Sequence, residues 1–121
     1  MGRIAVTDGI SDEAKSLLEK SGHEVVVKFY SMDELLDGVL SNFDAVIVRS
    51  ATKITADVIA ASKSSLSVIG RAGVGVDNID LAAAGKAGIP VVNAPRASTQ
   101  SVVELTIGHL LSSVRKVPKS D

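Results

Sequence analysis

Residues 66–93 read LSVIGRAGVGVDNIDLAAAGKAGIPVVN, and this stretch decides the expected fold. The apolar, β-branched runs at Leu66–Ile69 and Ile89–Val92 predict two strands. Between them Asp80 can cap a helix over Leu81–Ala87, which the next glycine would end. Strands joined through a helix pair in parallel, and such a crossover is nearly always right-handed. The stretch therefore predicts a unit of a parallel α/β sheet.

The same alternation of strands and helices occupies the residues before this stretch. Three further strands are predicted at Ile4–Thr7, His23–Lys28 and Asp44–Val48. The spacing of apolar residues predicts helices between them. One begins at Ser31, which has capping-box spacing, and its apolar period continues through Leu40. Another begins at Thr55.

Parallel strands separated by helices make a doubly wound sheet. We therefore expect an α/β fold: a five-stranded, flavodoxin-like (Rossmann-like, three-layer) sheet with strand order 2-1-3-4-5. Pro90 indicates that the fifth strand lies at an edge, because proline cannot donate to a neighbouring strand. Residues 1–97 are expected to form this sheet, and residues 98–121 contain a predicted long helix, Ser98–Val117.

The composition excludes several functional classes. The chain has 121 residues and a formal net charge of -1, so no general attraction to nucleic acid is indicated. It has no cysteine, and hence no disulfide, thiolate metal site or cysteine nucleophile. No apolar run approaches membrane-spanning length, and no metal site is predicted. We expect a soluble cytoplasmic domain.

Ligands of such sheets collect beyond the carboxyl ends of the strands, where this chain has basic residues. Arg49 follows the third predicted strand, and Arg71 follows the fourth. Either arginine alone is more simply a solvated or ion-paired side chain. Together, and beside the backbone N–H groups of Gly73-Val74-Gly75, they favour a site for a carboxylate or phosphate.

The sequence contains no self-sufficient catalytic set. His23 begins a strand and His109 lies in the predicted long helix, so both are more simply packing or surface residues. Asp8 and Glu104 are acid/base candidates, but a loop acid and an acid near a helix N-terminus explain them more simply. Residues 70–77 depart from the G-x-G-x-x-G motif, so no complete nucleotide-binding motif is present.

Three stretches carry a family resemblance. They are VRSATKITADVI at 48–59, IGRAGVGVDNIDLAAAGKAGIPVVNAP at 69–95 and STQSVVELTIGHLL at 98–111. In this order and spacing they resemble D-2-hydroxyacid dehydrogenases, and the residues around Arg49 and Arg71 look most like the phosphoglycerate dehydrogenase branch. The resemblance covers practically the whole chain.

The resemblance implies an oxidoreductase that transfers a hydride between NAD and a 2-hydroxy acid, here 3-phosphoglycerate at the start of serine synthesis. It also implies that the nucleotide-binding domain and the family's catalytic Arg, Glu and His lie outside these residues. This chain alone is therefore expected to be inactive and to bind NAD weakly at most. The helix 98–117 would cross to the nucleotide-binding domain in the family. In this chain we expect it to fold back on the sheet or to exchange between two chains of a homodimer.

The resemblance assigns roles to individual residues of this chain. The implied substrate-binding residues are Arg49, Ser50, Ala51, Arg71, Gly73, Val74, Gly75 and Ser98. Arg49 and Arg71 would bind the carboxylate or phosphate end of the substrate, and the backbone at Val74 would bind its carboxylate. Val74 and Val102 would lie near the nicotinamide.

Alternatives from other classes remain open. A receiver-like signalling module shares the strand order, but it needs an Asp after the third strand, where Arg49 stands, and a Lys after the fifth, where Asn93 stands. A free-standing flavodoxin needs a Ser/Thr-rich phosphate loop after the first strand, where Asp8-Gly9-Ile10-Ser11 stands. A split-enzyme half that joins a separate nucleotide-binding domain is a further alternative.

Overall fold

The computed structural model describes residues 2–9, 12–49, 51–62, 65–71, 78–93, 104 and 106–108. These residues form one five-stranded parallel sheet with the order β2-β1-β3-β4-β5. The strands are β1 (Arg3–Val6), β2 (Glu24–Val27), β3 (Ala45–Val48), β4 (Val68–Arg71) and β5 (Val91–Asn93). The predicted α/β class and the predicted strand order are confirmed.

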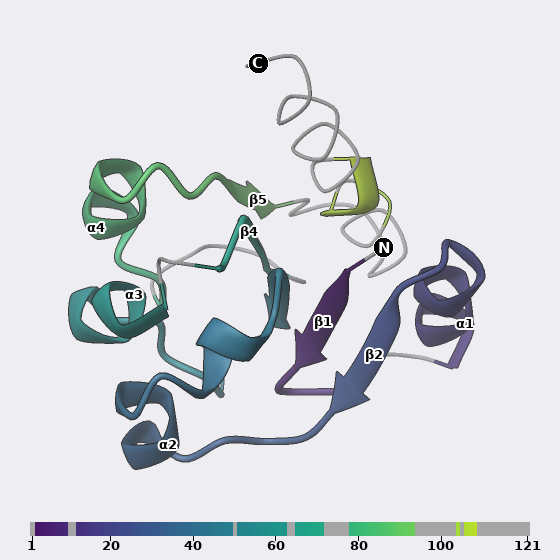
Figure 1. The fold of residues 1–121 in the computed structure, drawn as a ribbon, viewed down its shortest axis with the longest axis horizontal. Helices are drawn as coiled ribbons and strands as arrows, with labels where there is room; N and C mark the ends of the chain where they lie inside the picture. The colour runs from purple at the N-terminus through teal and green to yellow at the C-terminus, as the bar shows by residue number, and fades with distance from the viewer. Residues whose placement is uncertain are drawn as a thin grey trace.

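Helices cover both faces of the sheet (Figure 1). One face carries α1 (Asp12–Lys20), and the other carries α2 (Met32–Leu36), α3 (Ala56–Ser62) and α4 (Leu81–Lys86). Successive side chains of β3 point to opposite faces of the sheet. Val46 and Val48 pack with the α2–α4 layer, whereas Ala45 and Ile47 pack with α1. Because both faces are covered, every residue of β3 is buried.

Part of the predicted C-terminal helix lies on the α1 face. Thr106 is fully buried, and Ile107 packs against the core cluster that contains Val6 and Leu18. This contact, made within one chain, agrees with a helix that folds back on its own sheet. Exchange of the helix in a homodimer stays a prediction, as does the boundary at residue 97, because residues 94–103 and 109–121 lie outside the described residues.

The prediction of one helix from Ser31 through Leu40 is wrong for its second half. The capping box at Ser31 is present, but α2 ends at Leu36. Gly38 then has a φ of 87°, a left-handed conformation that glycine adopts without steric penalty. Leu40 is buried, as its spacing indicated, but from the separate 3₁₀ turn η1 (Val39–Asn42).

The last two strands begin later than predicted. β4 begins at Val68, not at Leu66, and ends at Arg71, not at Ile69. Arg71 pairs with a residue on each neighbouring strand, Val48 of β3 and Asn93 of β5, so it belongs to the sheet and not to a loop. β5 lies at the sheet edge as predicted, although Pro90 precedes the strand.

The predicted helix caps are confirmed where the structure describes them. The Asp80 carboxylate accepts a hydrogen bond from Ala83 N at 2.9 Å, and the Thr55 hydroxyl accepts one from Val58 N at 3.3 Å. Gly22 and Gly88 follow α1 and α4 with φ angles of 89° and 74°. Glycine ends these helices because it tolerates the left-handed conformation.

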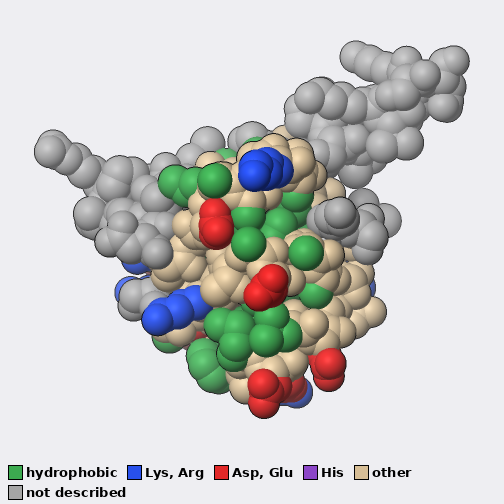
Figure 2. Space-filling model, turned by 90° about the vertical axis from the view of Figure 1, so that its left-hand side faces the viewer, with side chains coloured by type: hydrophobic (Ala, Val, Ile, Leu, Met, Phe, Trp, Pro, Cys, Tyr) green, Lys and Arg blue, Asp and Glu red, His purple; other side chains and the backbone are tan. Residues whose placement is uncertain are grey.

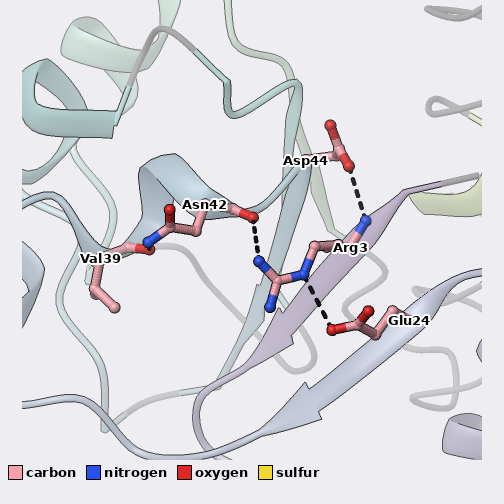
Figure 3. Close-up of polar contacts among 5 residues, drawn as sticks. All are labelled: Arg3, Glu24, Val39, Asn42 and Asp44. Carbon is pink, nitrogen blue, oxygen red and sulfur yellow. Dashed lines mark hydrogen bonds and ion pairs between the residues drawn. The ribbon is translucent and has the colours of Figure 1, made fainter.

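Polar contacts link the amino ends of β1, β2 and β3, at the edge of the sheet opposite the carboxyl ends of the strands (Figure 3). Arg3 forms an ion pair with Glu24 at 3.0 Å and donates to the carbonyl of Asn42 at 3.1 Å. Its backbone N–H donates to the Asp44 carboxylate at 2.8 Å, and the Asn42 side chain donates to the Val39 carbonyl at 3.2 Å. These groups are exposed, so their pairing adds little to stability.

On the outer surface of the α2–α4 layer, the hydrophobic side chains of the described residues lie in small groups (Figure 2). Hydrophobic side chains are interspersed there with acidic and basic ones. Met32, Leu36 and Leu81 are between 39% and 49% exposed. Scattered exposed hydrophobic residues of this kind are ordinary on protein surfaces.

His23 is a packing residue, as the sequence indicated. It is buried, and its Nδ1 accepts a hydrogen bond from Gly2 N at 3.1 Å. Its Nε2 has no hydrogen-bond partner among the described residues. Burial lowers the pKa of His23, because the charged imidazolium loses its hydration. The neutral imidazole is therefore the form that fits this position.

We predict that acidification destabilises the chain through His23. The pKa of His23 is lower in the folded than in the unfolded state, so the unfolded state binds the proton more readily. The contribution of neutral His23 is complete above the unfolded pKa of about 6.5. It is lost as the pH falls through the lower, folded pKa. Urea unfolding between about pH 5.5 and 7.5 measures the effect.

His23→Asn is the test variant, because its side-chain oxygen can accept from Gly2 N without titrating in this range. We expect the pH dependence of the unfolding free energy to be smaller in this variant. Equal pH dependence in wild type and His23→Asn would contradict the assignment.

Candidate functional site

The carboxyl ends of β1, β3 and β4 meet at one edge of the sheet. Val6 of β1 is in register with Ile47 of β3, and Val48 of β3 is in register with Arg71. Asp8 follows β1, Arg49 follows β3 directly and Arg71 is the last residue of β4. The parallel sheet therefore brings both arginines of the predicted anion site to neighbouring strand ends.

We call residues 49–52 the strap; Ser50 within it lies outside the described residues. Asp8 holds the N–H side of the strap. Its Oδ2 accepts from Arg49 N at 2.7 Å and from Thr52 N at 3.1 Å, and its Oδ1 accepts from the Thr52 hydroxyl at 2.6 Å. The hydroxyl oxygens of Thr52 and Thr7 lie 2.8 Å apart in a further, buried hydrogen bond. The strap is thus tied to the end of β1.

Asn78 holds the carbonyl side of the strap. Its Nδ2 donates to the carbonyl oxygens of Arg49 at 2.6 Å and Thr52 at 2.7 Å, and its Oδ1 accepts from Arg71 Nε at 2.9 Å. Carbonyl oxygens only accept and a guanidinium only donates, so these partners fix the orientation of the amide. One side chain therefore joins the strap to the end of β4.

The two arginines differ in their surroundings. Arg71 is only 9% exposed, and its Nε is engaged by Asn78. The side chain of Arg49 is exposed, whereas its backbone is held on both sides by Asp8 and Asn78. Ala51 and Lys53 are also exposed. The arrangement thus combines an exposed arginine, which an anion can reach from solvent, with a nearly buried one.

Several predicted site residues lie outside the described residues, so their roles stay predictions. These are Ser50, Gly73, Val74, Gly75, Ser98 and Val102. Among the residues that the structure describes, no cluster of His, Cys, Asp or Glu could hold a metal ion. In the same residues no helix is long and apolar enough to span a membrane.

The sequence did not reveal the polar network around the strap. Asp8 was recognised only as a loop acid, and Thr52 and Asn78 were assigned no structural role. Asn78 stands two residues before the capping Asp80, a position that gives no sign of contacts with residues 26 and 29 positions away. Asn78 is brought to the strap by the parallel bridge between Ile54 and Ile79 and by the hydrogen bond from Ile54 N to the Asn78 carbonyl.

The chain is similar to known dehydrogenases along most of its length. Residues 4–114 match the model of the D-isomer specific 2-hydroxyacid dehydrogenase catalytic domain. The chain is 48% identical over 120 residues to D-3-phosphoglycerate dehydrogenase of Methanocaldococcus jannaschii, covering 99% of this chain and 22% of that protein. It is 43% identical over 119 residues to hydroxypyruvate reductase of Thermotoga maritima, covering 98% of this chain and 38% of that protein.

A solved structure agrees with the sequence matches. NAD+-bound 3-phosphoglycerate dehydrogenase of Entamoeba histolytica superposes with a TM-score of 0.66 and 34% identity, over 78% of this chain and 33% of that chain. The chain thus spans between about a fifth and two fifths of the length of these relatives. Because the family model matches residues 4–114 of 121, the chain belongs to the D-isomer specific 2-hydroxyacid dehydrogenase family.

Proposed function

We propose that this chain is the substrate-binding part of an NAD-dependent 2-hydroxyacid oxidoreductase that oxidises 3-phosphoglycerate to 3-phosphohydroxypyruvate. The observation that carries the proposal is the placement of Arg49 and Arg71 at neighbouring strand ends, around a strap fixed by Asp8 and Asn78. The identity to a phosphoglycerate dehydrogenase supports the choice of substrate.

The chemistry of the substrate explains what these residues would contribute. 3-Phosphoglycerate carries a carboxylate at one end and a phosphate at the other, and arginine binds both groups through paired N–H donors. In the oxidation, C2 loses a hydride to NAD and the 2-hydroxyl loses its proton to a base. The base and the NAD-binding motif are expected outside this chain. The chain's part is to bind and orient the anion, which lowers the entropic barrier to the reaction.

Hydroxypyruvate is the second candidate substrate, because a hydroxypyruvate reductase is also a close relative. Hydroxypyruvate has a carboxylate and no phosphate. Two arginines at the site favour the doubly anionic ligand, since each guanidinium can pair with one anionic group. A receiver-like module is disfavoured by the family match. A split-enzyme half remains compatible with the proposed function.

We predict weak anion binding at the strand ends. Titration with 3-phosphoglycerate should shift the backbone amide resonances of residues 49–53 and 71–78, with an affinity in the millimolar range. A charge-assisted hydrogen bond contributes about 1.5–3 kcal/mol when it is shielded from solvent. Arg49 is exposed to solvent, so its hydrogen bonds to an anion contribute less. D-Glycerate, which lacks the phosphate, should bind more weakly than 3-phosphoglycerate.

Arg49→Gln should weaken this binding severalfold, because it removes an exposed guanidinium without removing a core contact. Arg3→Gln is the matched control: it removes the same charge at the opposite end of the sheet and should leave the affinity unchanged. Amide shifts that cluster away from the two strand ends would refute the site. Equal binding of D-glycerate and 3-phosphoglycerate would instead refute phosphate recognition.

We also predict that the chain alone does not produce NADH from NAD and 3-phosphoglycerate. The physical reason is that no described residue pairs a base with an orienting group, and no G-x-G-x-x-G motif is present in the sequence. NADH absorbance measures the reaction. Turnover by the purified chain, free of host enzyme, would contradict the prediction. Turnover that appears only after addition of a separate nucleotide-binding domain would support the split-enzyme alternative.

A further inference from the structure

We propose that Asn78 is a positioning residue that couples Arg71 to the strap, so that both arginines of the anion site are set as one unit. This inference rests on the proposed function, because it concerns the same anion site. Asn78 would not touch the substrate. It would act through the guanidinium of Arg71 and through the backbone of Arg49.

The bonds of the Asn78 side chain support this role. Its Nδ2 donates to two carbonyls of the strap at 2.6 and 2.7 Å, and its Oδ1 accepts from Arg71 Nε at 2.9 Å. The partners therefore come from two different strand ends. A shift of the strap relative to β4 would break at least one of these bonds. The amide therefore fixes the backbone of Arg49 relative to the guanidinium of Arg71, and with it the point from which the exposed Arg49 side chain would reach a ligand.

The side chain of Asn78 can be separated from the role of its backbone. The carbonyl of Asn78 accepts from Ile54 N at 2.8 Å, and the carbonyl of Ile54 accepts from Asp80 N at 2.9 Å. Ile54 and Ile79 form a parallel bridge, and both are buried in the core. The backbone at Asn78 is thus held independently of its amide. Removing the amide should leave the fold intact and free the strap from Arg71.

Asp8 cannot replace this coupling. Its carboxylate accepts from Arg49 N, Thr52 N and the Thr52 hydroxyl, so it anchors the strap to β1. Those bonds fix the strap but do not include Arg71. The amide of Asn78 does reach the guanidinium of Arg71, through its Oδ1. Loss of the amide should therefore disturb the relation between the two arginines and not the anchorage to β1.

The test compares two variants and a control in the 121-residue chain. Asn78→Ala removes the donor and the acceptor. Asn78→Asp keeps an acceptor for Arg71 but places a carboxylate oxygen against the carbonyls of Arg49 and Thr52. Asn42→Ala is the matched control, because the Asn42 side chain also donates to a backbone carbonyl but lies at the far end of the sheet.

Three quantities are measured for each protein: the Kd for 3-phosphoglycerate, the exchange rate of the Arg71 Nε–H, and the melting temperature. For Asn78→Ala we expect the Kd to rise roughly fivefold, the change that corresponds to one net hydrogen bond. The Arg71 Nε–H should exchange faster. Because Arg71 Nε and the Thr52 carbonyl lose a partner in part-buried surroundings, the melting temperature should fall below that of Asn42→Ala, with the variant still folded at the temperature of the binding measurement. For Asn78→Asp we expect the Kd to rise while the Arg71 Nε–H stays protected. A role confined to folding stability would lower the melting temperature and leave the Kd of folded Asn78→Ala unchanged.

The outcomes distinguish the two proposals. Binding by wild type, with an unchanged Kd and an unchanged Arg71 Nε–H rate in Asn78→Ala, overturns the positioning role and leaves the proposed function standing. Absence of binding by wild type overturns the proposed function and this inference with it. If Asn78→Ala fails to fold, Asn78→Asp decides: an unchanged Kd in that variant also overturns the positioning role.

Discussion

The carboxylate of Asp8 is the contact on which the geometry of the site depends. It accepts three hydrogen bonds from Arg49 and Thr52, and it comes from β1, the strand that pairs with β3. A chain that leaves a central strand needs such an acceptor, because hydrogen bonds to a charged group contribute about 1.5–3 kcal/mol each where they are shielded, as the part-buried bonds from Thr52 are. Asp8 supplies it at the position where the strap would otherwise be free to move. The strap can then present Arg49 outward while its backbone stays fixed.

The order of the parallel strands extends this constraint to the second arginine. Because β4 pairs with β3 on the other side, the strap lies between the ends of β1 and β4. Arg71 ends β4 as a nearly buried strand residue, and Asn78 returns from the following segment to join it to the strap. The sheet and the side chains of Asp8, Thr52 and Asn78 thus place Arg49 and Arg71 at one edge. This is the part of a 2-hydroxyacid dehydrogenase that binds and orients an anion in our proposal.

The sequence was sufficient for the architecture but not for the polar network. The alternating apolar runs and the caps at Asp80 and Thr55 are local signals, and the structure confirms them. The helix predicted through Leu40 failed because apolar spacing indicates which residues are buried and not whether the chain breaks at Gly38 between them. Asn78 was missed because its partners are distant in sequence. Side-chain bonds of that kind follow from the pairing of distant segments, here around Ile54 and Ile79, which no short motif encodes.

Native-state hydrogen exchange at the amides of Arg49 and Thr52 tests the central claim most directly. Arg49 is an exposed residue, so its amide would exchange rapidly if the strap were an ordinary surface loop. If the Asp8 carboxylate holds the strap, both amides exchange as slowly as those of the neighbouring strand β3, and Asp8→Ala accelerates both without accelerating Val46. Rapid exchange at both amides in the wild-type chain, or protection that survives Asp8→Ala, would contradict the account.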